Sequence, residues 1–238
     1  LDLLGHGLEV RGASSSLLDW LQDYWGFSHA TPMSGKVPAQ LFCLEDAPSH
    51  YPSEAPSILH FAEGEITCVN HDPTIWLGNQ ECGVRLRLEE TITLELWGQG
   101  DAQFAQLHIA LTEALRFKGF LPLHAAVAVR DGKARAFLGE SGSGKTTALL
   151  KAVEEGWQAL CEDFVWLEPD TLSLHRWDRG VRLLPDTAKR FDTLLGTTPS
   201  VHAAGKQFFR YSDLGWTASA GVLTELFWLN RHETKNVK

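Results

Sequence analysis

A glycine-rich segment at residues 139–147 carries the strongest chemical signal in the sequence. It reads Gly-Glu-Ser-Gly-Ser-Gly-Lys-Thr-Thr and holds every fixed position of the G-x-x-x-x-G-K-[ST] phosphate loop. Glycines let such a loop turn tightly and bring its backbone N–H groups against phosphate oxygens. Lys145 has the length to reach the β- and γ-phosphates, and the Thr146 hydroxyl suits a nucleotide-bound Mg²⁺. We therefore expect a site for ATP, or another nucleoside phosphate, together with Mg²⁺.

The neighbours of this loop fit that reading. Residues 134–138 form a short apolar run typical of a strand, and residues 145–155 have the pattern of a helix. The positive end of the helix dipole would then face the bound anion. A glycine-rich turn with a chance Lys-Thr is the alternative, and this context disfavours it. The residues expected to contact the nucleotide are Gly139, Glu140, Ser141, Gly142, Ser143, Gly144, Lys145, Thr146 and Thr147.

Two adjacent acids, Glu162 and Asp163, follow the next apolar strand candidate at residues 156–161. In an open α/β sheet the carboxyl ends of strands face the ligand crevice. Phosphoryl transfer needs a carboxylate to hold the metal and a group that orients or deprotonates the nucleophile. One of the two acids could hold Mg²⁺ while the other accepts a hydroxyl proton. A solvated acidic turn is the alternative.

Other polar residues give weaker signals. His124 lies in Leu-Pro-Leu-His-Ala-Ala-Val, and a lone histidine beside an apolar strand is usually a core residue. Four arginines are candidates for additional phosphate contacts, although each alone is as easily explained as solvated surface. They are Arg176, Arg179, Arg182 and Arg210.

Taken together, these segments resemble the HPr kinase/phosphorylase type of P-loop protein. The shared order over about residues 121–170 is His-Ala-Ala-Val, a β-hairpin, the phosphate loop, a helix, and a strand that ends in two acids. Residues 179–191, Arg-Gly-Val-Arg-Leu-Leu-Pro-Asp-Thr-Ala-Lys-Arg-Phe, resemble the shorter HPr-kinase-related proteins, which include the kinases of lasso-peptide gene clusters.

The resemblance implies a role for each matching residue. His124 would support the catalytic acids, and Lys145 would serve phosphoryl transfer. Glu162 falls on the position of the general base, where the family usually has Asp, and Asp163 on the position linked to the metal, which it would share with Thr146. The chain has no match to the Glu-Ile-Arg-Gly signature of true HPr kinases. The acceptor is therefore left open.

The expected function is an ATP- and Mg²⁺-dependent kinase that transfers the γ-phosphate to a hydroxyl. The acceptor would be a serine or a terminal group of a peptide or protein. Two alternatives are a nucleotide-dependent binding or regulatory module without transfer, and a kinase of a small metabolite. Residues 1–118 contain 16 acidic and 6 basic residues, an unsuitable balance for binding nucleic acid. A solvated acidic surface or a basic peptide partner fits this balance better.

Composition gives broader limits. A chain of 238 residues with 44% hydrophobic and 21% charged residues is typical of a globular protein. No stretch approaches the roughly 20 apolar residues needed to cross a bilayer, so we expect no membrane partner. The four cysteines show no CxxC spacing, which favours reduced thiols and a cytoplasmic location. A homo-oligomer remains open.

The expected fold is α/β: a P-loop core of HPr-kinase type with a mixed sheet over 119–238, preceded by a smaller α+β region over 1–118 that could recognise a substrate or partner. Asp131-Gly132 between two apolar runs predicts a hairpin before the loop. The predicted helices cover 14–25, 101–117 and 186–195. Strands are predicted at 8–11, 58–61, 65–69, 74–77, 84–88, 91–97, 123–129, 164–168, 172–176, 180–184 and 221–229, with loops at 28–57 and 197–206.

Overall fold

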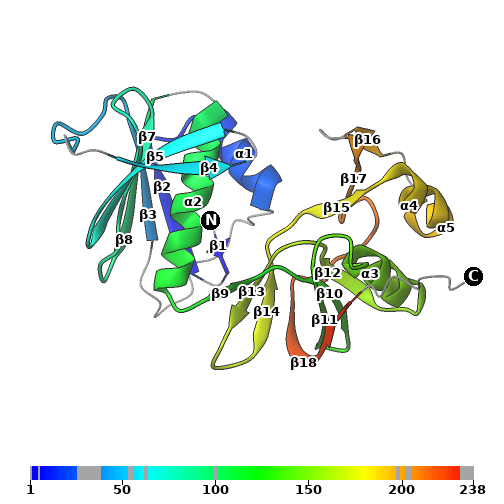
Figure 1. The fold of residues 1–238 in the computed structure, drawn as a ribbon. Coiled ribbons are helices and arrows are strands. Elements are labelled where there is room, and N and C mark those ends of the chain that lie inside the picture. The colour runs from blue at the N-terminus through cyan, green and yellow to red at the C-terminus, as the bar shows by residue number, and fades with distance from the viewer. Residues whose placement is uncertain are drawn as a thin grey trace, which may run out of the picture. The chain divides into compact units, whose positions relative to one another are not determined.

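The structure is a computed structural model of the chain. It describes every residue except 1, 5, 26–38, 53–55, 62–63, 99–100, 197–198, 202–204 and 231–238. The chain divides into two compact units, Leu1–Lys118 and Gly119–Lys238. Both units are mixed α/β, with large mixed sheets and few helices (Figure 1). The two units are nearly equal in length.

The described part of the first unit holds an eight-stranded sheet in the order β1-β2-β3-β8-β7-β6-β5-β4. The pairs β2–β3 and β3–β8 are parallel, and the other pairs are antiparallel. The second helix packs on β6, β7 and β8. The elements are β1 (Asp2–Leu3), β2 (His6–Arg11), α1 (Ser15–Trp25), β3 (Ala39–Leu44), β4 (Ser57–Phe61), β5 (Gly64–His71), β6 (Thr74–Gly78), β7 (Gly83–Arg87), β8 (Ile92–Trp97) and α2 (Asp101–Phe117).

One predicted loop in this unit contains a strand. The prolines of 28–57 favoured a loop, but Ala39–Leu44 forms β3, a central parallel strand. Its buried Ala39 and Leu41 alternate with partly exposed residues, as in a strand that covers a core. The parts of the predicted loop at 28–38 and 53–55 lie outside the described residues.

The described part of the second unit has a seven-stranded sheet in the order β12-β10-β11-β18-β14-β13-β9 and a three-stranded sheet in the order β15-β17-β16. The pair β11–β18 is parallel, and every other described pair is antiparallel. The strands are β9 (Leu121–Leu123), β10 (Ala126–Arg130), β11 (Lys133–Leu138), β12 (Gln158–Cys161), β13 (Val165–Glu168), β14 (Ser173–Arg176), β15 (Gly180–Leu183), β16 (Ser200–Val201), β17 (Gln207–Arg210) and β18 (Ala220–Trp228). The helices are α3 (Lys145–Glu154), α4 (Pro185–Arg190) and α5 (Asp192–Leu195).

The seven-stranded sheet curves back on itself. β9 and β10 stand far apart in the strand order, yet only His124 and Ala125 separate them in the chain. The strand predicted at 123–129 is therefore broken at His124. Alternate residues of β10 serve two cores: Val127 faces the inside of the curved sheet, and Ala126 and Ala128 face α3. Their small side chains let the helix approach the sheet closely.

The local predictions around the phosphate loop are confirmed. β10 and β11 form the expected antiparallel hairpin, with Asp131 and Gly132 in its turn at φ of 52° and 74°. A helix begins at Lys145, and β12 follows it. The single helix predicted at 186–195 is instead two short helices that meet at Phe191. No helix of the described residues is long and apolar enough to cross a membrane.

Candidate functional site

Strand direction brings three sequence segments to one edge of the sheet. β11 and β12 lie on either side of β10, and both are antiparallel to it. The carboxyl ends of β11 and β12 therefore meet the amino end of β10. The phosphate loop at 139–147 follows β11, Glu162 and Asp163 follow β12, and His124 lies just before β10. Segments nearly 40 residues apart thus surround one site.

Glycine is required at two positions of the loop for different reasons. At Gly139, with φ of 145°, an added Cβ would lie 2.4 Å from the carbonyl oxygen of Leu229. At Gly144, which precedes α3, space is free within 4 Å but φ is 101°, a conformation that favours glycine. The loop's shape therefore depends on the end of β18 as well as on its own sequence.

We expect Gly139→Ala to destabilise the protein by about 2 kcal/mol, because the residue combines a strained φ with a backbone clash. Gly196→Ala is the matched control: its φ is 56° and nothing lies within 4 Å of the added Cβ. The control should cost about 1 kcal/mol. Urea unfolding of both variants measures the difference. Equal destabilisation of the two would contradict a specific contact with Leu229.

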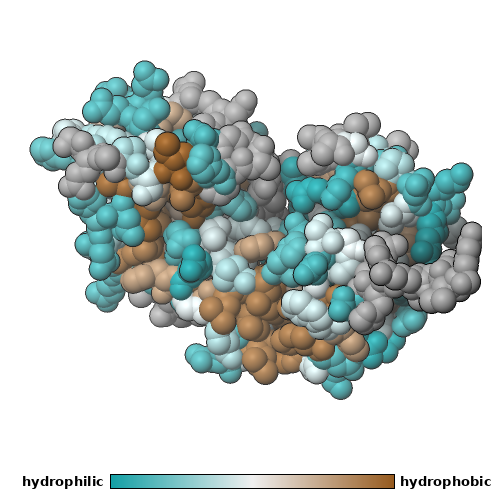
Figure 2. All heavy atoms as spheres, in the orientation of Figure 1, coloured by the Kyte–Doolittle hydropathy of each residue, from teal (hydrophilic) through white to brown (hydrophobic). Residues whose placement is uncertain are grey.

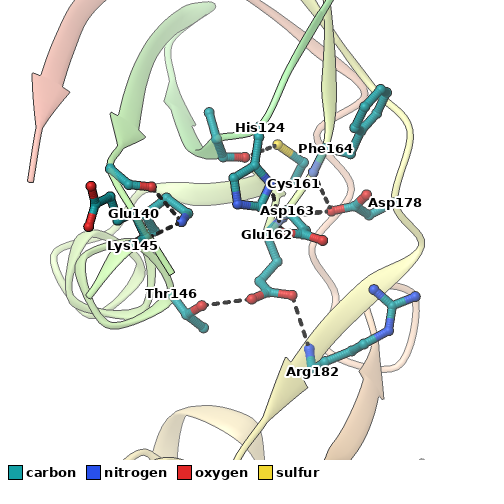
Figure 3. A network of polar contacts seen from close by, with 12 residues as sticks. His124, Glu140, Lys145, Thr146, Cys161, Glu162, Asp163, Phe164, Asp178 and Arg182 are labelled. Atoms are coloured by element: carbon teal, nitrogen blue, oxygen red, sulfur yellow. Dashed lines mark hydrogen bonds and ion pairs between the residues drawn. The ribbon is translucent and has the colours of Figure 1, made fainter. Parts of the chain in front are cut away.

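Lys145 is buried at the start of α3, with 9% of its surface exposed. Its Nζ donates hydrogen bonds to the carbonyl oxygens of Gly139 at 2.8 Å and Glu140 at 3.2 Å (Figure 3). Loop carbonyls therefore hold the ammonium group against the phosphate loop, where a phosphate chain can compete for its protons.

Thr146 and Glu162 form the tightest polar pair of the site. The Thr146 hydroxyl donates to Glu162 Oε1 at 2.6 Å, and the Arg182 backbone N–H lies 3.5 Å from Glu162 Oε2 (Figure 3). Glu162 is 9% exposed. A hydroxyl and a carboxylate are the oxygen donors that Mg²⁺ prefers, and Mg²⁺ usually takes one or two carboxylates plus substrate phosphates. Among the described residues no group of three or more His, Cys, Asp or Glu is placed to hold a metal ion.

Asp163 turns to a different partner. Its Oδ1 lies 3.0 Å from Nδ1 of His124, and these side chains are 49% and 59% exposed. The Thr146 hydroxyl contacts Glu162, whereas Asp163 contacts His124. The two adjacent acids have distinct surroundings: one carboxylate is buried and the other is accessible.

A buried thiol holds the backbone in place where the chain leaves β9 and enters β10, next to His124 and Asp163. Cys161 Sγ donates to the carbonyl oxygen of Ala125 at 3.2 Å. Burial raises the pKa of Cys161 well above its ordinary value, so the thiol remains a neutral donor. All four cysteines are free thiols. The contact ties the end of β12 to the residue after His124.

Asp178 is a site residue that the sequence analysis missed. Its Oδ2 accepts hydrogen bonds from three consecutive backbone N–H groups, those of Glu162 at 3.0 Å, Asp163 at 2.8 Å and Phe164 at 3.3 Å. One carboxylate therefore shapes the turn that carries both acids. In the sequence, Asp178 is simply an acidic residue between Trp177 and Arg179. It belongs to no motif that would connect it with the phosphate loop.

The pKa of Asp178 is raised from 3.8 to about 6, chiefly because burial disfavours the carboxylate, although the three N–H bonds oppose this. Between these values the folded protein holds a proton that the unfolded chain releases. Asp178 therefore favours folding most below pH 4, and this contribution is lost as pH rises to about 6. Relative to Asp178→Asn, wild type should gain about 2–3 kcal/mol between pH 7 and pH 4. Urea unfolding at several pH values measures this gain, and parallel pH curves would contradict it.

The arginine candidates have mainly structural contacts. Arg176 donates to the carbonyl oxygen of Trp216 at 3.3 Å and packs over the Tyr211 ring. Burial lowers the pKa of Arg176. Arg179 and Arg182 both lie over the Phe208 ring. Arg210 ends β17 and pairs in register with Gly180.

The first unit contains a separate cavity of about 530 Å³. It lies where the parallel strands β2, β3 and β8 end, near the start of α1. Its polar lining includes Ser14, Glu45 and Gln103. The Ser14 hydroxyl already accepts the Leu17 N–H at 3.2 Å, as a helix cap does.

Comparison with models of known protein families found no match to this chain. A search of curated proteins also found no similar sequence.

Proposed function

We propose that this protein is a Mg²⁺- and ATP-dependent kinase that transfers the γ-phosphate to a hydroxyl group of a peptide or protein. One observation carries the proposal: a complete phosphate loop and an acidic turn share one sheet edge, with Thr146 Oγ1 2.6 Å from Glu162 Oε1. The strand order around the loop also agrees with the resemblance to HPr-kinase-type proteins, in which a hairpin precedes the loop and two acids follow the next strand.

The phosphate chain would bind at the amino end of α3. The backbone N–H groups at the start of the helix and the helix dipole favour an anion there. Lys145 would exchange its bonds to loop carbonyls for bonds to β- and γ-phosphate oxygens. Thr146 and Glu162 would hold Mg²⁺, which neutralises charge on the phosphates.

The accessible Asp163 is the better candidate for the base. Its carboxylate is 49% exposed and reachable by an acceptor, whereas Glu162 is buried against Thr146. This division of roles reverses the one implied by the resemblance. His124 Nδ1, 3.0 Å from Asp163 Oδ1, would orient the carboxylate, and Asp178 would hold the backbone of the turn.

Phosphate transfer would be a direct displacement at the γ-phosphorus. The acceptor oxygen forms a bond to the γ-phosphorus while the bond from that phosphorus to the bridging β–γ oxygen breaks. Asp163 takes the acceptor proton, and ADP leaves with the electron pair of the broken bond. Positioning and electrostatic stabilisation supply most of the rate enhancement in such reactions.

The test is phosphate transfer itself. The purified chain is incubated with γ-labelled ATP, Mg²⁺ and candidate acceptors, including the peptides encoded by neighbouring genes, and mass spectrometry locates the phosphate. We expect transfer to a hydroxyl of a peptide. ATP binding without consumption in the presence of any acceptor would indicate a regulatory module instead. Transfer only to a free metabolite would contradict the peptide acceptor.

A further inference from the structure

The carboxyl end of β18 carries an exposed aromatic residue next to the residue that precedes the phosphate loop. Trp228 is 68% exposed, although tryptophan is usually well buried. It pairs in register with Leu138, the residue directly before Gly139. The next residue, Leu229, donates its N–H to the Leu138 carbonyl at 2.7 Å. Trp228 is therefore held beside the beginning of the loop.

The strand order indicates which way a bound nucleotide runs. On one side of β11 lie β10 and β12, and on the other side lies β18. The acids Glu162 and Asp163 follow β12, so the phosphate that is transferred must point to that side. The nucleoside then extends from the loop toward the opposite side, where β18 ends.

We propose that Trp228 stacks on the base of the bound nucleotide. This inference rests on the proposed nucleotide site and adds the part of that site which holds the nucleoside. An indole offers a wide flat face, and stacking depends little on the identity of the base. ATP and GTP should therefore bind with similar affinity.

The neighbouring side chains support this assignment. Phe227, on the other face of the strand, stacks on Phe137 with ring centroids 5.6 Å apart and an interplanar angle of 23°. That contact anchors the strand end and leaves Trp228 exposed. Figure 2 shows apolar side chains at the surface of this unit around β13, β14 and β18.

Calorimetric titration of the full chain with Mg-ADP and with Mg-tripolyphosphate separates base contacts from phosphate contacts. Trp228→Ala should bind ADP roughly tenfold more weakly and tripolyphosphate within about twofold of wild type. Trp228→Phe should retain most of the ADP affinity. Leu226→Ala is the matched control, since Leu226 is 55% exposed, lies on the same strand two residues earlier, and should change neither affinity.

The outcomes separate this inference from the proposed function. Unchanged ADP binding by Trp228→Ala, with wild type still preferring ADP to tripolyphosphate, would overturn the stacking role and leave the nucleotide site intact. An equal loss of affinity for ADP and for tripolyphosphate would also overturn the stacking role, because it would show that the substitution damages the phosphate loop. If wild type binds neither ligand, the nucleotide site itself is wrong.

Discussion

Lys145→Ala should reduce phosphate transfer by about a thousandfold or more. The ammonium group is buried and held by two loop carbonyls, which places its positive charge at the phosphate loop. Without Lys145, the γ-phosphate loses the main positively charged side chain that would contact it. The measurement is initial velocity at saturating Mg-ATP, together with the affinity for Mg-ADP.

Lys151→Ala is the matched control for this experiment. Lys151 lies on the same helix, is 52% exposed, and forms an ion pair with Glu154 at 2.8 Å. Exposed pairs of this kind contribute little to stability, so this variant should keep wild-type activity. If Lys145→Ala retains a tenth or more of the activity, or if both variants lose it equally, the phosphate-loop role of Lys145 is contradicted.

Asp163→Asn should lower kcat by about 10²–10⁴-fold while leaving the affinity for Mg-ADP nearly unchanged. The amide is the same size but cannot accept the hydroxyl proton. Glu162→Gln should behave differently: it weakens an oxygen ligand beside Thr146, so the Mg²⁺ concentration needed for half-maximal rate should rise. Single-turnover rates across a Mg²⁺ series distinguish the two variants.

His124 supplies the internal check on this assignment. His124→Ala should slow transfer about tenfold, because the carboxylate loses its orienting contact, and should add little to the loss in Asp163→Asn. Asp170→Asn is the control for a substitution outside the site, because Asp170 is exposed and follows β13. A fully active Asp163→Asn together with an Mg²⁺-independent loss in Glu162→Gln would restore the roles that the family resemblance implies.

Local signals in the sequence predicted the part of the site that depends on adjacent residues. The glycines and Lys145 fix the loop, Asp131-Gly132 fixes the hairpin before it, and the helix begins where the loop ends. The sequence signal for each of these features lies within a few residues. This is why they could be read without knowledge of the tertiary structure.

The remaining features depend on contacts between distant residues. The partner of Thr146 is decided by how β12 aligns on β10, where a register irregularity lies beside Val127. Asp178 reaches the acidic turn from 14 to 16 residues away. The strand at Ala39–Leu44 was missed in the sequence analysis, because the surrounding prolines favour a loop and the alternation of apolar and polar residues in this segment is weak. The segment is a strand because it pairs in parallel with β2 and β8 and buries alternate side chains.

The parallel pairing of β11 with β18 has a consequence for the order of folding. Thr224 Oγ1 donates to the Ala134 carbonyl across 90 residues of sequence, and Leu229 flanks Gly139. Contacts of such long range form slowly, because the intervening chain must be ordered first. During synthesis the phosphate loop would lack its contact with Leu229 until that residue has left the ribosome. A nucleotide would then bind only after the second unit has folded, and it would stabilise the folded state without guiding its formation.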